Sequence, residues 1–122
     1  MKETLLDVSL LLAILLKKHP DHQRALGWLA GAKPVLCPIV ELGWVRISTK
    51  AYGLKIAESL NSLKTLKRKA GFIACDISLE DTSAAPNSGK TTDWYLADLA
   101  KKHGMKWATL DKRANHPNAE LV

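Results

Sequence analysis

Four acidic residues lie at positions where a carboxylate could do chemistry. Asp7 stands inside an almost wholly apolar run, residues 4–16, and Glu41, Asp93 and Asp111 lie beside other apolar segments. A lone buried carboxylate is costly unless a partner meets it. Carboxylates that converge repel one another, and a hard divalent cation such as Mg²⁺ relieves that repulsion while also binding phosphates. These residues therefore suggest metal-assisted chemistry on a phosphate, provided that the fold brings them together.

Each acid also has an ordinary structural explanation. Asp7 suits a helix cap or an ion pair, and Asp93 at a helix start would complement the helix dipole by about 0.3–1 kcal/mol. Glu41 is equally suited to the first turn of a helix, and Asp111 to a turn. Only their placement relative to one another can favour a site over these alternatives.

Apolar runs and helical periodicities alternate along the chain, and they predict the elements that must position the acids. Ser9 is the expected N-cap of the first helix, and the polar segment 78–90 is expected to be a loop. Strands are predicted at residues 5–8, 34–37, 72–77, 106–110 and 119–122, and helices at residues 9–17, 21–30, 38–49, 54–66 and 94–103.

Strands separated by helices predict an α/β fold with a mainly parallel sheet of four or five strands and helices on both faces. In such sheets the binding crevice lies beyond the carboxyl ends of the strands. Asp7 ends the first predicted strand and Asp111 follows the fourth, while Glu41 and Asp93 begin helices that follow other strands or loops. All four acids thus map to one edge of the sheet.

Composition limits the class of protein. The 122 residues, 47% hydrophobic, suit one domain spanning residues 1–122. The apolar stretch 5–16 is shorter than the roughly 20 residues that cross a bilayer, and no signal-cleavage pattern follows it, so a cytoplasmic protein without a membrane span is expected. Cys37 and Cys75 have no metal-binding spacing and are expected to be buried thiols. The net charge of +6 suits a nucleic-acid partner, although lysine-rich helix faces are usually just solvated.

Five segments, in register along nearly the whole chain, resemble the PIN domain, and more narrowly the VapC-type ribonuclease toxins of toxin-antitoxin systems. These segments are Leu6-Asp-Val-Ser-Leu-Leu-Leu-Ala13, His19-Pro-Asp-His-Gln-Arg-Ala-Leu26, Glu41-Leu-Gly-Trp-Val-Arg46, Gly89-Lys-Thr-Thr-Asp-Trp-Tyr-Leu-Ala97 and Ala108-Thr-Leu-Asp111.

The resemblance implies a three-layer α/β/α domain that cleaves RNA with Mg²⁺ or Mn²⁺. It implies an antitoxin as partner and a homodimer as the assembly. The metal would polarise the scissile phosphate and activate a water. The residues implied as metal ligands and catalytic groups are Asp7, Glu41, Asp93 and Asp111, and those implied as supporting groups are Ser9, Thr109 and Arg46.

Two other functions remain open at this point: a PIN-fold module that binds RNA or a partner without cutting it, and a receiver-like or phosphatase-like domain. Glu41, on a helix and not at a strand end, disfavours the second. His19 and His22 have the spacing of a metal pair but fit a charged surface better. Trp94 is the aromatic residue placed to meet a base, because it follows Asp93.

Overall fold

A computed structural model describes residues 2–122. Its five strands form one parallel sheet in the order β3-β2-β1-β4-β5, and this confirms the predicted fold class. The strands are β1 (Glu3–Leu6), β2 (Lys33–Leu36), β3 (Gly71–Phe72), β4 (Lys106–Thr109) and β5 (Ala119–Leu121). The helices are α1 (Val8–Leu15), α2 (His22–Ala30), α3 (Pro38–Lys50), α4 (Ile56–Lys67) and α5 (Thr91–Lys102), with the short 3₁₀ turns η1 (Leu79–Asp81) and η2 (Ser88–Lys90) before α5.

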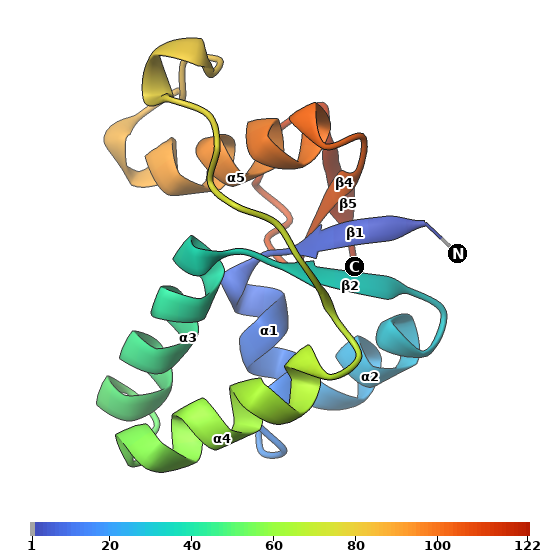
Figure 1. The fold of residues 1–122 in the computed structure, drawn as a ribbon, viewed down its shortest axis with the longest axis vertical. Coiled ribbons are helices and arrows are strands. Elements are labelled where there is room, and N and C mark those ends of the chain that lie inside the picture. The colour runs from blue at the N-terminus through green and yellow to red at the C-terminus, as the bar shows by residue number, and fades with distance from the viewer. Residues whose placement is uncertain (1) are drawn as a thin grey trace.

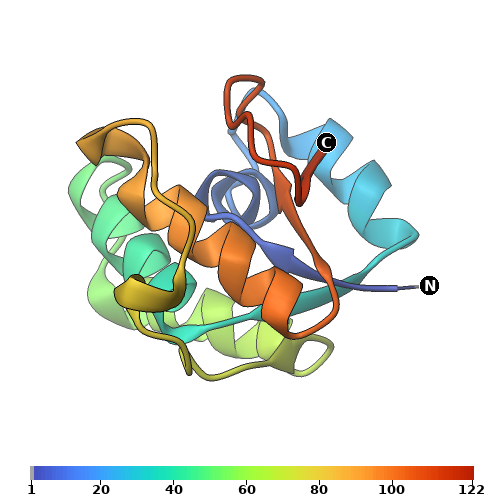
Figure 2. The same ribbon diagram turned by 90° about the horizontal axis from the view of Figure 1, so that it is seen from above.

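The helices form layers on the two faces of the sheet. Figure 1 shows α5 on one face and α1 with α2 on the other, while α3 and α4 pack together as an arm beside α1. Seen from above, α5 lies across the sheet and the segment before it passes along its outer side (Figure 2). The core is built from the apolar faces of these layers, and Trp44 and Trp107 are its largest fully buried side chains.

Two central strands carry the site because they end at the same edge. In the parallel register, Leu6 of β1 lies beside Ala108 of β4, and the Asp7 N–H continues the ladder by donating to the Ala108 carbonyl at 2.8 Å. Asp7 and the residues that follow Thr109 therefore leave the sheet side by side. The topology itself brings together acids that are about 100 residues apart in sequence.

Helix α3 approaches α1 closely at Gly43. A β-carbon at Gly43 would lie 2.7 Å from Cγ2 of Val8, closer than van der Waals contact permits. Since Val8 is the first residue of α1, this contact fixes where α3 begins relative to Asp7. Glycine at this position is a packing requirement next to the acids.

Most predicted elements are shifted by one or two residues at their ends, and three differences bear on the site. The first helix begins at Val8 with Asp7, not Ser9, as its N-cap, because the Asp7 carboxylate accepts the Val8 N–H at 2.8 Å. Helix α5 begins at Thr91, three residues earlier than expected. The predicted strand 72–77 is wrong in length: β3 pairs only at Val35 and Leu36, since β2 ends there, and the chain then turns toward α5.

The expectation that both cysteines are buried thiols holds in part. Cys37 is buried and Cys75 is half-buried, and both are free thiols. Burial raises the pKa of the Cys37 thiol to about 11, which keeps it protonated and unreactive near neutral pH. Within residues 2–122, none of the helices combines the length and the apolar character that a bilayer crossing requires.

Candidate active site

Asp7 is the centre of a small hydrogen-bond network at the carboxyl edge of the sheet. Its side chain is 6% exposed, and its Oδ2 accepts hydrogen bonds from Thr109 Oγ1 at 2.6 Å and from Ser9 Oγ at 2.9 Å. Burial raises the pKa of Asp7, and the charge of Asp111 adds to the rise, while these hydrogen bonds lower it. The network orients the carboxylate, but it provides no positive charge to stabilise the ionised form of this buried acid.

Thr109 links Asp7 to the last acid. Its hydroxyl donates to Asp7 and accepts the Asp111 N–H at 3.1 Å, and the residue is fully buried at the end of β4. Asp111 itself accepts the Arg113 N–H at 2.9 Å. Thr109 and Ser9, both singled out from the sequence, therefore contact Asp7 directly.

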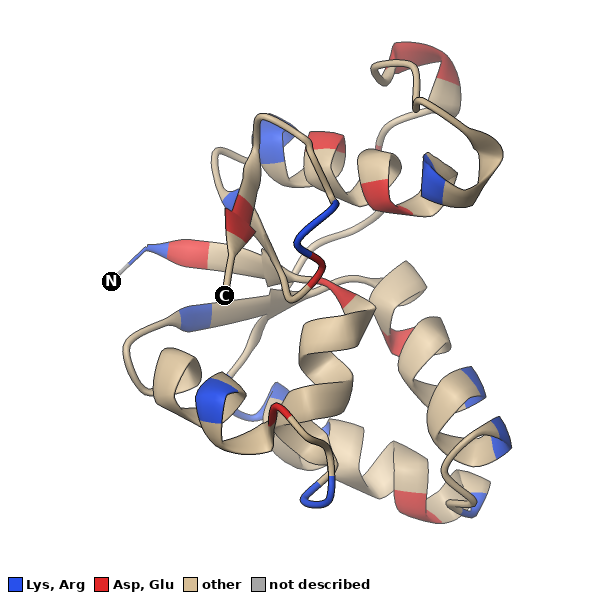
Figure 3. Cartoon of the chain, turned by 180° about the vertical axis from the view of Figure 1, so that it is seen from behind, with Lys and Arg blue, Asp and Glu red and all other residues tan. Residues whose placement is uncertain are grey.

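Asp93 faces the same two acids from the first turn of α5. Burial, the largest cause, acts together with the negative charges of Asp7 and Asp111 to raise the pKa of Asp93 to about 6, against a smaller lowering by Lys90. Three carboxylates from β1, α5 and the segment after β4 thus share one electrostatic environment. Figure 3 shows acidic positions meeting where the strands give way to α1, with basic positions over the outer side of the α3–α4 arm.

Lys90 is a site residue that the sequence did not point to, because it lies at the end of a segment read only as a loop. Its ammonium lies 3.8 Å from Asp111 Oδ2 and also donates to the Arg113 carbonyl. Lys90 is the residue of η2 that precedes α5, so the same turn that places Asp93 also places this cation. It compensates part of the negative charge.

Glu41 is not brought to the other three acids in the same way. It lies in the first turn of α3, and its Oε2 forms an ion pair at 2.8 Å with Nζ of Lys67 at the end of α4. Lys67 also lies 4.6 Å from the centre of the Phe72 ring. Arg46 is exposed further along α3 and forms no ion pair among residues 2–122.

The chemistry of the acids fits a divalent cation, although the site is not closed around one. Across residues 2–122, no three Asp, Glu, His or Cys side chains lie close enough to hold one ion as they stand. Asp7, Asp93 and Asp111 nevertheless offer hard oxygen donors. Burial first, and then repulsion among the acids, raises the pKa of Asp7 and of Asp93, and a bound cation would stabilise their ionised forms. A shared ion would draw these carboxylates inward.

The two histidines considered as a metal pair have local roles instead. His19 Nδ1 accepts the Asp21 N–H at 3.0 Å, and His22 Nδ1 lies 2.7 Å from the Ala13 carbonyl. These bonds secure the turn between α1 and α2, at the end of α1 that is remote from Asp7.

Comparison with known proteins agrees with this architecture. The PIN domain family model matches residues 4–119. Ribonuclease VapC44 of Mycobacterium tuberculosis is 34% identical over 121 residues, covering 88% of this chain and 85% of that protein. Ribonuclease VapC38 of the same organism is 33% identical over 118 residues, covering 88% of this chain and 84% of its own length.

A solved structure shares the fold. The crystal structure of VapBC2 from Rickettsia felis, bound to a DNA fragment from its promoter, matches with a TM-score of 0.68 and 14% identity, over 99% of this chain and 98% of that one. An α/β/α domain with acids at the carboxyl edge of a parallel sheet is the class that the fold and site define. The chain belongs to the PIN domain family, and its curated relatives there are VapC ribonucleases.

Proposed function

We propose that this protein is a metal-dependent endoribonuclease and the toxin of a toxin-antitoxin pair. The observation that carries the proposal is the shared environment of Asp7, Asp93 and Asp111 at the sheet edge where α/β proteins bind ligands, in which burial and then charge repulsion raise the pKa of Asp7 and of Asp93. The names of the VapC relatives, which align along nearly the whole chain, support ribonuclease as the activity.

Mg²⁺ or Mn²⁺ is the proposed cofactor, held by Asp7, Asp93 and Asp111. When bound, such an ion supplies charge neutralisation for the acids and Lewis-acid polarisation of the phosphodiester. Thr109 and Ser9 hold the Asp7 carboxylate in place through their hydroxyls. Lys90, whose ammonium lies near Asp111 and donates to the Arg113 carbonyl, is proposed to contact a substrate phosphate.

Glu41 is proposed to take part in the reaction without being one of the three residues that hold the metal. Its ion pair with Lys67 must open before its carboxylate can hold a water or position the nucleophile, and the pair is partly exposed, so opening costs at most about 1 kcal/mol. Arg46, exposed on the same helix, is proposed to touch RNA.

An antitoxin is the proposed protein partner, in the cytoplasm where both would meet RNA. The described structural neighbour is a toxin-antitoxin complex, and this supports the pairing. Leu42, Ile56 and Leu60 expose 63%, 62% and 50% of their surfaces on α3 and α4, and such apolar exposure marks protein contact surfaces. A homodimer is also part of the proposal, and sedimentation of the purified chain tests it.

A cleavage assay on purified protein tests the activity. Structured RNA should be cut with Mg²⁺ or Mn²⁺ and left intact with a chelator, and Asp7→Ala should remove the cutting. Asp21→Ala is the matched control, because Asp21 is a surface acid whose partner is Arg24, at 3.1 Å. If wild type and Asp7→Ala leave the same background at every metal concentration, the ribonuclease assignment is wrong.

The same assay separates a second candidate, a PIN-fold module that binds RNA or a partner without cutting it. The ion pair that holds Glu41 on Lys67, away from the other acids, is the observation that favours this candidate. RNA binding by wild type without any cleavage, in either metal, would select it.

A further inference from the structure

A second polar cluster lies on α5, beyond the acids. His116 Nε2 lies 2.9 Å from Asp98 Oδ1, and Asp98 Oδ2 accepts both the N–H and the hydroxyl of Ser83 at 2.7 Å. The His116 side chain is 4% exposed and that of Asp98 is 15% exposed. Because Ser83 donates to Asp98 and not to His116, the cluster is not arranged to activate a serine nucleophile.

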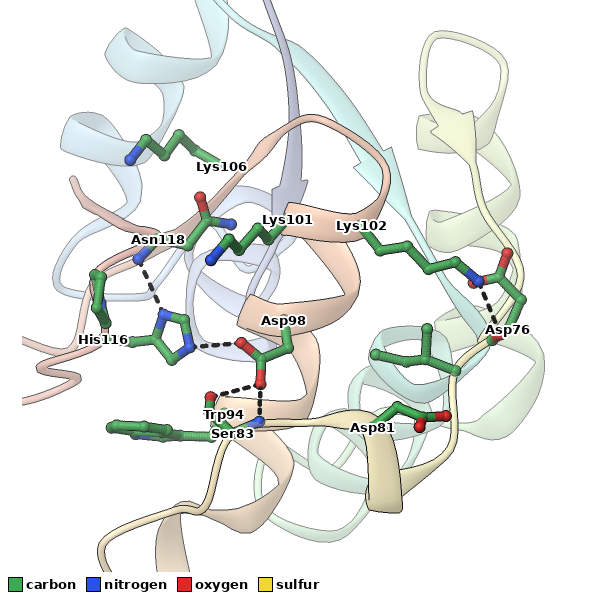
Figure 4. A pocket seen from close by; sticks show the side chains of 12 residues that line it. Asp76, Asp81, Ser83, Trp94, Asp98, Lys101, Lys102, Lys106, His116 and Asn118 are labelled. Carbon is green, nitrogen blue, oxygen red and sulfur yellow. Dashed lines mark hydrogen bonds and ion pairs between the residues drawn. The ribbon is translucent and has the colours of Figure 1, made fainter.

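The cluster forms the floor of a cavity of about 1050 Å³. One wall is a single face of α5, on which Trp94, Asp98, Lys101 and Lys102 follow one another at helical spacing. The segment before α5 and the segment after β4 close the other sides. Figure 4 shows these side chains converging from the three segments.

The charges around the cavity are unequally satisfied. Asp98 is paired with His116, and Asp76 is paired with His103 at 3.0 Å and with Lys102 at 3.4 Å. Lys101 and Lys106 form no ion pair with any described residue, and Figure 4 shows both reaching toward the Asn118 side. Asp81, on the opposite loop, is the one lining acid that lacks a pair among residues 2–122.

Trp94 joins this cavity to the acids. It follows Asp93 directly and lines the cavity, where its ring meets that of His116 edge-on with centroids 4.7 Å apart. Its Nε1 is buried without a hydrogen-bond partner among the described residues. From Asp93 to Lys101 the helix advances about 12 Å, so a strand held at the acids reaches the lysines within a few nucleotides.

We propose that this cavity is a binding subsite for single-stranded RNA next to the cleavage site, with a phosphate on Lys101 and Lys106 and a nucleoside against Trp94. Two lysines without ion pairs and an aromatic ring that line the same cavity are the combination that holds single strands without reading sequence. The subsite rests on the proposed ribonuclease function, and it specifies the path of the substrate strand beyond the acids. It also explains why a long segment is secured over α5 through Ser83.

The test measures the salt dependence of binding for a labelled single-stranded RNA in the presence of a chelator. Lys101→Gln with Lys106→Gln is the test pair, and Lys17→Gln with Lys18→Gln, exposed in the turn after α1, removes the same charge elsewhere. Each lost phosphate contact lowers the magnitude of the slope of log K against log salt by about 0.7, and the test pair, which removes the one phosphate held by both lysines, should lower it by about that much. Equal slopes for the two pairs would overturn the subsite.

Photo-cross-linking gives a readout that does not depend on a variant folding. RNA carrying 4-thiouridine should cross-link to the α5 peptide that contains Trp94, or to the peptide around His116. Trp94→Leu should weaken RNA binding by about 5- to 100-fold, and Trp94→Phe should restore most of it. Cross-links confined to other peptides would contradict the proposal.

The outcomes distinguish this subsite from the function on which it rests. If wild type neither binds nor cuts RNA, both proposals fail together. If wild type binds and cuts RNA while the Lys101 and Lys106 pair behaves as the control pair does, only the subsite fails. Loss of antitoxin affinity with unchanged RNA affinity would make the cavity a protein contact and would also overturn it.

Discussion

Helix α5 carries two half-buried aspartates with opposite electrostatics, Asp93 at its start and Asp98 in its middle. Burial and, to a smaller extent, the neighbouring acids raise the pKa of Asp93 to about 6. Burial also acts to raise the pKa of Asp98, but hydrogen bonds from Ser83 and His116 outweigh it and lower that pKa. Two aspartates on the same helix thus differ in the direction of their pKa shift, because only Asp98 has enough hydrogen-bond partners to offset its burial.

On the proposed function, the difference separates a carboxylate that serves the chemistry, Asp93, from one that serves the structure, Asp98. Asp98 has its partners within the chain, and breaking them leaves buried polar groups unmet. Asp93 has only the partial compensation of Lys90, and its repulsion from Asp7 and Asp111 is removed only by a cation from outside. A carboxylate that lies among other acids without enough compensating charge therefore indicates the site better than the mere presence of an acidic residue does.

The largest effect is expected at Asp93, the aspartate whose pKa is raised. Asp93→Asn should lower metal-dependent RNA cleavage by more than about 100-fold, because it removes a proposed ligand and not a group that merely supports one. Single-turnover cleavage and calorimetric Mn²⁺ titration measure this. Unchanged Mn²⁺ affinity in the variant would take Asp93 out of the ligand set.

Thr109→Val should come next. The valine keeps the shape but cannot donate to Asp7, and groups that hold a ligand in place contribute about 10- to 100-fold to metal affinity or activity. Thr109→Ser is the matched control, since it retains the hydroxyl and should retain most of the activity. If both variants cleave alike, the hydrogen bond at 2.6 Å does not orient the site.

Asp98→Ala tests how much the hydrogen bonds of Asp98 contribute to stability. It leaves Ser83 and His116 without their acceptor, and we expect the free energy of unfolding to fall by about 1–3 kcal/mol. Denaturant unfolding measures this loss. The contrast with Asp93→Asn would collapse if Asp98→Ala were neutral in stability and as damaging to cleavage.

The smallest effect is the pH dependence of stability without metal. Because the pKa of Asp93 in the folded chain is about 6, above its ordinary 3.8, the folded state holds this proton more tightly than the unfolded state. Stability should therefore fall as pH rises from about 4 to 6 and level off above. Asp93→Asn should reduce the fall by about 1 kcal/mol, after discounting for solvent screening. Denaturant unfolding at several pH values in chelator checks this, and an equally steep fall in the variant would contradict it.

Much of the fold was predictable because its signals are local. The alternation of short apolar runs with helical periodicities indicated the parallel sheet, and it placed Asp7 at the end of one predicted strand and Asp111 directly after another. The hydroxyls of Ser9 and Thr109 were also identified before their contacts with Asp7 were known. The length of β3 was not predictable, since it depends on how much of β2 is left to pair.

The partners of the polar side chains were mostly beyond prediction. Glu41 meets Lys67 only because α4 folds back along α3, and nothing near Glu41 in the sequence indicates that pairing. Lys90 and Ser83 lie in a segment with no periodicity, and each finds its partner in another part of the chain. Such contacts are set by the packing of distant elements and not by spacing.

The sequence by itself determined that strands and helices alternate, and hence that Asp7 and Asp111 emerge at one edge of a parallel sheet, because each lies at or just beyond the carboxyl end of a buried strand. The tertiary structure alone decided which carboxylates share an environment and which are neutralised. Asp93 is left facing Asp7 and Asp111, while Asp98 and Glu41 are paired within the chain. The physical reason is that the charge on a buried carboxylate depends on its surroundings in three dimensions, which local sequence patterns do not specify.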